Sequence, residues 1–276
     1  MEPFVLEQET VLLRIAEWEK EFPGLVAGFT TRQGGVSNLP FESMNCGLHV
    51  GDQLQSVVEN RKQLCRLLDF PFESWTCADQ IHGSEIAVIR TTERGRGRTR
   101  MEDAITGTDG LITSEKNVLL TSFYADCVPL LIMEPEQKWV GIAHAGWKGT
   151  AAAISQKIVE SIVSEQGVKK QNLRVAIGPS IGGCCYEVDD YVVNRISEKL
   201  HPETAKDWLE DTTNGKYHID LKRVNYHMFI QAGIPHEHIQ VSSWCTSCRN
   251  DLFFSYRADG GKTGRMAAFL GWREEV

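Results

Sequence analysis

The sequence predicts an α+β protein: a single-domain layered sandwich in which mixed β-sheets are flanked by helices. Apolar runs of strand length cluster between residues 108 and 143 without a helical pattern between them, so strands and helices do not alternate as in a Rossmann fold. The sequence contains neither a dinucleotide-binding glycine pattern nor a P-loop. No linker-like segment divides the 276 residues, so residues 1–276 are expected to form one domain.

Composition and charge narrow the class of function. The net charge of −8 at pH 7 disfavours a general nucleic-acid surface. No apolar run approaches the roughly 20 residues of a membrane helix, and the N-terminus lacks the layout of a signal peptide. We therefore expect a cytoplasmic protein that acts on small molecules. In that compartment the eight cysteines are interpreted as thiols or metal ligands rather than disulfides.

The N-terminal part is predicted to contain a strand, a short polar helix around residues 15–20 and a strand over residues 25–30. The polar loop over residues 30–37 carries Arg32 and a glycine pair, which can hold an anion, although an ordinary turn explains the same pattern. Asp52 is placed to cap the next helix, which Pro71 ends. The predicted apolar stripe of this helix comprises Leu54, Val57, Val58, Leu64, Cys65 and Leu68.

Residues 74–79 are predicted to form a strand and residues 85–90 the returning strand, so His82 falls in a tight connection, Gln80-Ile-His82-Gly83. The arginine- and glycine-rich residues 91–103 follow. A nucleic-acid arm is conceivable there, but the acidic charge of the chain favours a solvated loop or a lid that attracts an anionic substrate.

A dense β region comes next, with buried strands predicted at residues 111–113, 118–124, 128–133 and 139–143. An acid, a thiol and a proline interrupt two of these apolar runs in the segment Tyr124-Ala-Asp126-Cys127-Val-Pro129. Because proline cannot donate a hydrogen bond to a strand ladder, we expect pairing to break at Pro129.

His144 stands where the last of these strands turns into a helix, and active-site groups often occupy such junctions. Two glycines flank Trp147 and Lys148 in the turn. The helix that follows should direct Ile154, Ile158, Ile162 and Val163 inward and end at Gly167.

The C-terminal part is predicted in the same way. A strand over residues 173–177 leads into a glycine-rich loop over residues 178–187. Helices capped by Asp189 and Asp220 are separated by a polar surface excursion over residues 201–217. Strands at residues 239–241 and 266–272 complete the chain.

Three residues stand out because each lies at or near a strand end beside a turn or a proline: His82, Cys127 and His144. Two imidazoles and a thiolate suit Zn²⁺, and three protein ligands leave the open position of a catalytic site. The competing interpretation is a buried cysteine and two unrelated histidines. A third interpretation makes Cys127 a nucleophile with His144 or His82 as its base and Asp126 as the orienting acid.

The pair Cys245-x-x-Cys248 is typical of a zinc site or a redox dithiol. A structural zinc needs two further ligands, and Cys184-Cys185 is the obvious source. Because adjacent cysteines cannot easily bind one ion together, we interpret these residues as buried or surface thiols.

Several motifs, taken in order, resemble the YfiH/YlmD family, long labelled laccase-domain or polyphenol oxidase. The N-terminal ones are Thr30-Thr-Arg-Gln-Gly-Gly-Val-Ser37, His49-Val-Gly-Asp52, Gln80-Ile-His82-Gly83 and Ala125-Asp-Cys127-Val-Pro129. The others are His144-Ala-Gly-Trp-Lys-Gly149, Gly178-Pro-Ser-Ile-Gly182, Phe253-Phe-Ser-Tyr-Arg257 and Thr263-Gly-Arg-Met266. The resemblance covers nearly the whole chain.

This resemblance implies a compact α/β/β/α sandwich and a metal centre formed by His82, Cys127 and His144. It implies a zinc ion, with copper as an alternative. It also implies phosphorolysis of purine nucleosides (adenosine, inosine, guanosine and methylthioadenosine) to the base and ribose 1-phosphate, with adenosine deamination as a second activity. The partners are then nucleosides and phosphate.

The candidate catalytic residues are Cys127, His144, His82 and Asp126. The candidate phosphate-binding residues are Arg32, His49 and Lys148, which lie in polar, glycine-flanked loops. The family usually has arginine at the position of Lys148, and lysine loses the bidentate geometry. The alternative functions are a copper-dependent polyphenol oxidase, a cysteine hydrolase and a metal-binding regulatory protein without turnover. The oligomeric state stays open.

Overall fold

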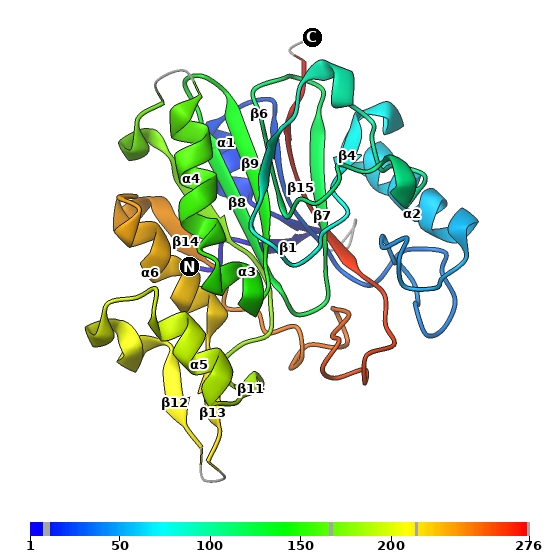
Figure 1. The fold of residues 1–276 in the computed structure, drawn as a ribbon. Helices are drawn as coiled ribbons and strands as arrows, with labels where there is room; N and C mark the ends of the chain where they lie inside the picture. The colour runs from blue at the N-terminus through cyan, green and yellow to red at the C-terminus, as the bar shows by residue number, and fades with distance from the viewer. Residues whose placement is uncertain (8–11, 166–167, 213–214, 275–276) are drawn as a thin grey trace.

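The computed structural model describes residues 1–7, 12–165, 168–212 and 215–274 and contains two large mixed sheets (Figure 1). The first sheet has the order β1 (Val5–Glu7), β2 (Leu12–Arg14), β3 (Leu25–Thr30), β15 (Met266–Trp272), β7 (Leu119–Tyr124) and β4 (Trp75–Cys77). The second has the order β14 (Ile239–Val241), β10 (Arg174–Ile177), β8 (Val128–Glu134), β9 (Trp139–Ala145), β6 (Gly110–Thr113) and β5 (Ile86–Val88). A small third sheet contains β11 (Glu187–Val188), β13 (Tyr217–Ile219) and β12 (Leu209–Asp211).

The two large sheets pack face to face, and their facing side chains form one core. Phe29 and Leu270 of the first sheet belong to the same buried cluster as Leu131 and Ile142 of the second. Fully burying one such side chain contributes roughly 1.5–3 kcal/mol. The central strands β7, β8, β9 and β15 are buried along their whole length, since both faces of each sheet are covered.

Helices cover the outer faces of this sandwich. On the second sheet, α4 (Ile154–Ser164) buries Ile154, Ile158 and Ile162 beside α6 (Leu221–Gln231). On the first sheet, α2 (Leu54–Leu67) buries Leu64 and Cys65. Figure 1 shows α3, α4 and α6 on one side and α2 on the other, which gives the four layers α/β/β/α. The predicted α+β sandwich is therefore confirmed.

The remaining helices are short. They are α1 (Ala16–Glu21), α3 (Trp147–Ala151), α5 (Asp190–Ser197) and the 3₁₀ turns η1 (Phe72–Ser74), η2 (Thr91–Glu93), η3 (Met101–Asp103), η4 (Lys170–Asn172), η5 (Pro202–Asp207) and η6 (His236–His238). No helix in the described ranges is long and apolar enough to cross a membrane.

Local sequence signals predict several elements correctly. The strands β3, β14 and β15 have the predicted bounds. The caps at Asp189 and Asp220 are confirmed, because their carboxylates accept hydrogen bonds from backbone N–H groups of the first helical turns. Gly167, the predicted end of α4, lies outside the described residues.

Two predictions in the N-terminal half are wrong. The α2 helix has Gln53 at its N-cap, without a side-chain cap; Asp52 instead accepts hydrogen bonds from the side-chain amide of Asn45 and the backbone N–H of Gln53. Leu54, a member of the predicted apolar stripe, is exposed at the helix start. The strand β5 pairs with β6 in the second sheet, whereas β4 belongs to the first. Residues 78–85 therefore cross between the sheets rather than forming a hairpin.

Two further predictions are corrected by tertiary contacts. Pairing of β8 with β9 continues through Pro129, which lies opposite His144 near the start of the strand. The carbonyl of Pro129 accepts a hydrogen bond from the Gly178 N–H at 2.8 Å, so the proline costs the sheet only one donor. The arginine-rich segment 91–103 is partly exposed, as expected for a solvated loop, but it is held by hydrogen bonds: the Gly95 N–H donates to Thr76 Oγ1, and the Arg96 guanidinium donates to the carbonyls of residues 103 and 104. The polar excursion contributes β12 and β13 to the third sheet.

Arg61 of α2 should be a strong determinant of stability. Its guanidinium is fully buried and donates to the carbonyls of Cys46, Gly97 and Arg98 at 2.8, 2.7 and 3.0 Å. We expect Arg61→Leu to lower the free energy of unfolding by roughly 3 kcal/mol, because buried carbonyls lose a charged donor. Urea denaturation measures this change. The exposed Arg66→Leu should leave the midpoint nearly unchanged, and equal midpoints for both variants would contradict this role of Arg61.

Candidate metal centre

Three side chains from separate segments meet at one end of the sandwich. His82 lies on the crossing between β4 and β5, Cys127 on the crossing between β7 and β8, and His144 near the end of β9. One ring nitrogen of each histidine and the sulfur of Cys127 all lie within 4.8 Å of one another. The two imidazole rings meet edge to face, with centroids 4.8 Å apart. We call this group the His–Cys–His triad; its donors are those that zinc and copper accept.

Asp109, just before β6, orients the triad. Its carboxylate lies 2.9 Å from Nδ1 of the buried His144, which leaves Nε2 to face Cys127. The same carboxylate accepts the backbone N–H groups of His82 and Gly83 at 3.0 and 2.6 Å. A carboxylate behind a histidine is the usual support of a metal-binding imidazole. Sequence reasoning missed Asp109; the available signal was an acid beside a glycine at the start of a buried strand.

The backbone around the triad adopts conformations that non-glycine residues rarely take. Gln80, His82 and Asp126 have φ angles of 51°, 61° and 87°. Residues held in this left-handed region cost about 1–3 kcal/mol each and cluster at functional sites. The Gln80 side chain fixes the segment by hydrogen bonds to the backbone N–H and carbonyl of Phe123 at 2.7 and 2.9 Å.

Charges within the triad stabilise a thiolate. Burial alone would raise the pKa of Cys127, but the charges and hydrogen bonds of His144 and His82 lower that pKa to about 6. Burial also opposes the charged form of His144, yet the Cys127 and Asp109 contacts raise the pKa of this imidazole. A thiolate present at neutral pH can serve as a metal ligand or as a nucleophile.

The triad opens into a cavity of about 540 Å³, a size typical of small-molecule sites. Its lining comprises His49, Asp79, Gln80, His82, Phe123, Ala125, Asp126, Cys127, His144, Trp147, Ile181, Tyr186, Tyr256, Arg257 and Arg265. Four aromatic side chains and two guanidinium groups are therefore present beside the triad. A more open hollow of about 610 Å³, lined by Phe22 and Trp272 among others, has no cysteine or histidine in its lining.

Two of the other predicted residues line this cavity. Both carboxylate oxygens of Asp126 are engaged, by the Thr246 hydroxyl at 2.6 Å and the Arg257 N–H at 2.7 Å, so Asp126 holds the neighbouring loop. His49 keeps contact with solvent, but desolvation and the nearby Arg265 charge lower the pKa of its imidazole. His49 is thus a neutral hydrogen-bonding group at pH 7.

The other two predicted anion-binding residues lie elsewhere. Arg32 is not part of the cavity lining; its guanidinium donates to the carbonyls of Glu42 and Asn250 and covers the Phe254 ring. Lys148 is exposed on α3, with Nζ 5.8 Å from the Trp147 ring. Their glycine-flanked loops resemble anion sites, but neither side chain is part of the cavity lining. Arg257 and Arg265, which sequence reasoning did not select, occupy the cavity instead.

Comparison with known proteins agrees with the motif resemblance. The family model described as "Multi-copper polyphenol oxidoreductase laccase" matches residues 26–273. "Purine nucleoside phosphorylase YlmD" of Geobacillus stearothermophilus is 48% identical over 254 residues, covering 92% of each chain. The protein of the same name from Bacillus subtilis is 40% identical over 275 residues, covering 99% of this chain and 98% of its own. The crystal structure of YlmD from Geobacillus stearothermophilus superimposes with a TM-score of 0.95 at 45% identity, covering 99% of this chain and all of that one.

Proposed function

Because this chain belongs to the family described as multi-copper polyphenol oxidoreductase laccase, whose curated relatives carry the name purine nucleoside phosphorylase, we propose that it cleaves purine nucleosides with phosphate. Adenosine, inosine, guanosine and methylthioadenosine are the proposed substrates, and adenosine deamination is a second activity. One observation supports the proposal most: a single cavity combines the His–Cys–His triad, aromatic walls and two guanidinium groups.

The triad is the proposed holder of a zinc ion. Two imidazole nitrogens and a thiolate are a suitable donor set, and Asp109 fixes the Nδ1 side of His144 as a metal site requires. A zinc ion held there supplies a Lewis acid that can polarise a substrate or a water molecule. The cavity side of the triad is where a nucleoside would lie.

The remaining cavity residues would bind the two substrates. Phe123, Trp147, Tyr186 and Tyr256 offer aromatic faces to a purine. The guanidinium groups of Arg257 and Arg265 offer charge to phosphate, for which arginine is well shaped. In phosphorolysis a phosphate oxygen forms the bond to C1′ while the bond from C1′ to the purine nitrogen breaks. The base leaves with that electron pair and gains a proton, so correct placement of phosphate is essential.

Deamination would use the same bound nucleoside. Water adds at C6 of adenosine and ammonia leaves, which gives inosine without consuming phosphate. The two reactions therefore differ in their nucleophile, and the phosphate dependence of product formation separates them.

An assay of each nucleoside with and without phosphate, on protein of measured metal content, tests the proposal. Base and sugar 1-phosphate should appear only when phosphate is present, and adenosine should yield inosine without phosphate. If metal-replete protein converts none of the four nucleosides, the proposal fails. Oxidation of a phenol only after copper is added would favour the oxidase alternative.

A cysteine hydrolase is the second candidate, because Cys127, His144 and Asp109 form a thiolate–imidazole–carboxylate line. Iodoacetamide distinguishes the two functions. In the zinc enzyme, bound metal should protect Cys127 from alkylation, and a chelator should abolish turnover. In the hydrolase, turnover should continue after a chelator is added and should stop once iodoacetamide alkylates Cys127.

Arg265 should contribute most to phosphate binding, because it is half-buried in the cavity wall and desolvation strengthens its interaction with an anion. We expect Arg265→Ala to raise KM for phosphate by roughly 30-fold, since a charged hydrogen bond is worth about 1.5–3 kcal/mol. Steady-state kinetics at varied phosphate measure this. Arg195→Ala, at an exposed position on α5, is the control, and Arg32→Ala should also leave KM for phosphate unchanged. An unchanged KM in Arg265→Ala would remove Arg265 from the site.

A further inference from the structure

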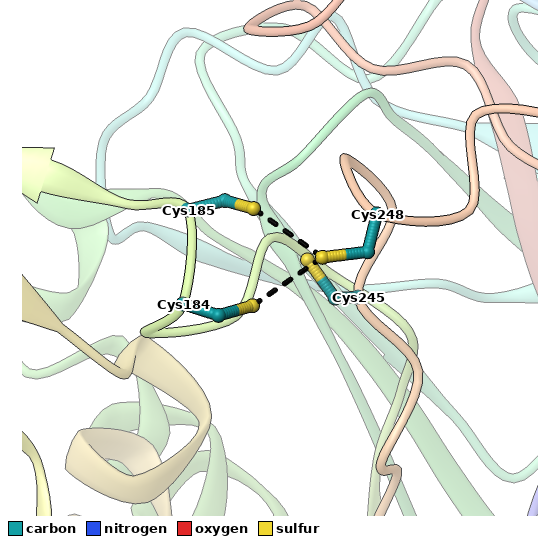
Figure 2. Close-up of side chains that lie close together, drawn as sticks. All are labelled: Cys184, Cys185, Cys245 and Cys248. Atoms are coloured by element: carbon teal, nitrogen blue, oxygen red, sulfur yellow. Dashed lines mark hydrogen bonds between the residues drawn. The ribbon is translucent and has the colours of Figure 1, made fainter.

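Four cysteine sulfurs converge at a second place in the molecule. Cys184 and Cys185 lie between β10 and β11, and Cys245 and Cys248 lie after β14. All four sulfurs are within 4.8 Å of one another, and we call them the cysteine cluster. Figure 2 shows Cys184 and Cys185 both directed toward Cys248, with S–S separations of 3.5 and 3.4 Å. Both adjacent thiols therefore approach one partner sulfur, although the sequence suggests that adjacent cysteines cannot easily bind one ion together.

The spacing of the sulfurs fits a shared metal ion. A tetrahedral zinc site with Zn–S bonds of about 2.3 Å has sulfurs about 3.8 Å apart. The sulfur–sulfur distances in the cluster lie between 3.4 Å and 4.8 Å, a range that includes this value. One sulfur of the cluster, that of Cys248, approaches both of the adjacent thiols, which a single disulfide does not require.

The backbone is built closely around the sulfurs. The Gly182 N–H donates to the sulfur of Cys245 at 3.2 Å, as amides commonly do to metal-bound thiolates. A Cβ at Gly182 would lie 3.3 Å from the Cys184 sulfur and 3.4 Å from the Cys245 Cβ, which leaves little room for a side chain. The Thr246 N–H donates to the Ser180 carbonyl at 3.0 Å and joins the two segments beside the cluster.

A buried positive charge lies close to the cluster. Lys222 of α6 is 4% exposed and donates to the Trp244 carbonyl at 2.8 Å. Burial lowers the pKa of Lys222, while the charges of Asp220, Cys245 and Cys184 act in the opposite direction. Four thiolates around Zn²⁺ carry a net charge of −2, so a nearby ammonium group offsets part of that charge.

We propose that the cysteine cluster binds one Zn²⁺ as a structural tetrathiolate site, separate from the His–Cys–His triad. Each cysteine loses its thiol proton to solvent when the ion binds, and no electron is transferred. A closed site with four sulfur ligands has no open position for a substrate. Its role is to hold two chain segments together.

The first of those two segments lines the cavity, and the second segment supports it from behind. Ile181 and Tyr186 flank the first cysteine pair and line the cavity directly. On the second segment, Thr246 donates to Asp126, and the Arg257 guanidinium donates to the Cys185 carbonyl at 3.3 Å. The ion at the cluster thus positions the cavity wall without touching substrate.

Metal analysis of protein purified with reductant and without oxygen tests the assignment. The wild type should contain about two zinc ions per chain, and Cys248→Ser and Cys127→Ala about one each. Cys65→Ala, which removes a buried thiol of α2 outside both groups, should retain about two. Cys248→His keeps a zinc-binding side chain and should restore the second ion.

Cobalt substitution supplies a spectroscopic readout of the ligand set that does not depend on counting zinc ions. Wild type and Cys127→Ala loaded with Co²⁺ should both show the intense sulfur-to-cobalt absorption of a tetrathiolate, and Cys248→Ser should lack it. The assignment is overturned if Cys127→Ala loses all zinc and the cobalt spectrum, or if the cluster cysteines are found paired in disulfides. An iron centre in the purified protein would also overturn the assignment of zinc. None of these results depends on nucleoside turnover, so the proposed function is tested separately.

Discussion

Cys127→Ala should lose bound metal at the His–Cys–His triad together with at least about 10³-fold of nucleoside turnover. A metal acting as a Lewis acid contributes several kcal/mol to transition-state stabilisation, and about 4 kcal/mol corresponds to this factor. Removing the sulfur leaves two imidazoles, and His144 loses the thiolate that raises its pKa. Zinc content and kcat/KM for inosine, measured on the same preparation, give the two quantities.

Cys46→Ala is the matched control, since it removes a fully buried thiol that belongs to neither the His–Cys–His triad nor the cysteine cluster. It should keep its zinc and its turnover. If Cys127→Ala retained turnover within about threefold of wild type, neither the zinc mechanism nor the cysteine mechanism would survive. Cys127→His separates these mechanisms, because histidine can replace the metal ligand but not the thiol nucleophile.

Asp109→Asn should weaken zinc binding by about 10- to 100-fold, the usual effect of removing the carboxylate behind a metal-binding histidine. An amide keeps the shape of the side chain but loses the charge that fixes the His144 tautomer. It also weakens the acceptor for the His82 and Gly83 N–H groups, so two triad segments loosen together. Competition with a chromophoric chelator measures the dissociation constant.

The same carboxylate makes stability depend on pH in the metal-free protein. Burial raises the pKa of Asp109, but the His144 contacts and the backbone N–H groups of Gly83 and His82 together hold that pKa below its ordinary value. A depressed carboxyl pKa contributes stability above the unfolded pKa, and that contribution is lost as pH falls through the folded value. Asp109→Asn should therefore flatten the acid side of the stability profile. Asp103→Asn, on η3, is the control, and an unchanged zinc affinity in Asp109→Asn would show that Asp109 does not support the centre.

The sequence predicts the triad because each member has a local signal. His82, Cys127 and His144 each lie at or near a strand end, beside a turn or a proline. The caps at Asp189 and Asp220 are equally local, and so are the bounds of β3, β14 and β15. Patterns within about ten residues suffice for such features.

Features that depend on distant contacts were not predictable in this way. Arg32 and Arg265 both follow polar or glycine-rich sequence, and both guanidinium groups donate to backbone carbonyls, yet only Arg265 lines the cavity. Which sheet β5 joins was equally hidden, because its sequence fits either neighbour. The cysteine cluster unites residues more than 60 positions apart, a separation at which spacing rules fail.

Two of the three triad residues lie on chain crossings that lead from the first sheet to the second. An ion bound there would link the two sheets at the points where the chain passes from one to the other. The two sheets could then separate only after the ion dissociates. The residence time of the ion would therefore limit the rate of unfolding, and with it the rates of thermal inactivation and proteolysis. Metal-loaded and metal-free molecules would then differ in the rate of unfolding, even where their folded structures coincide.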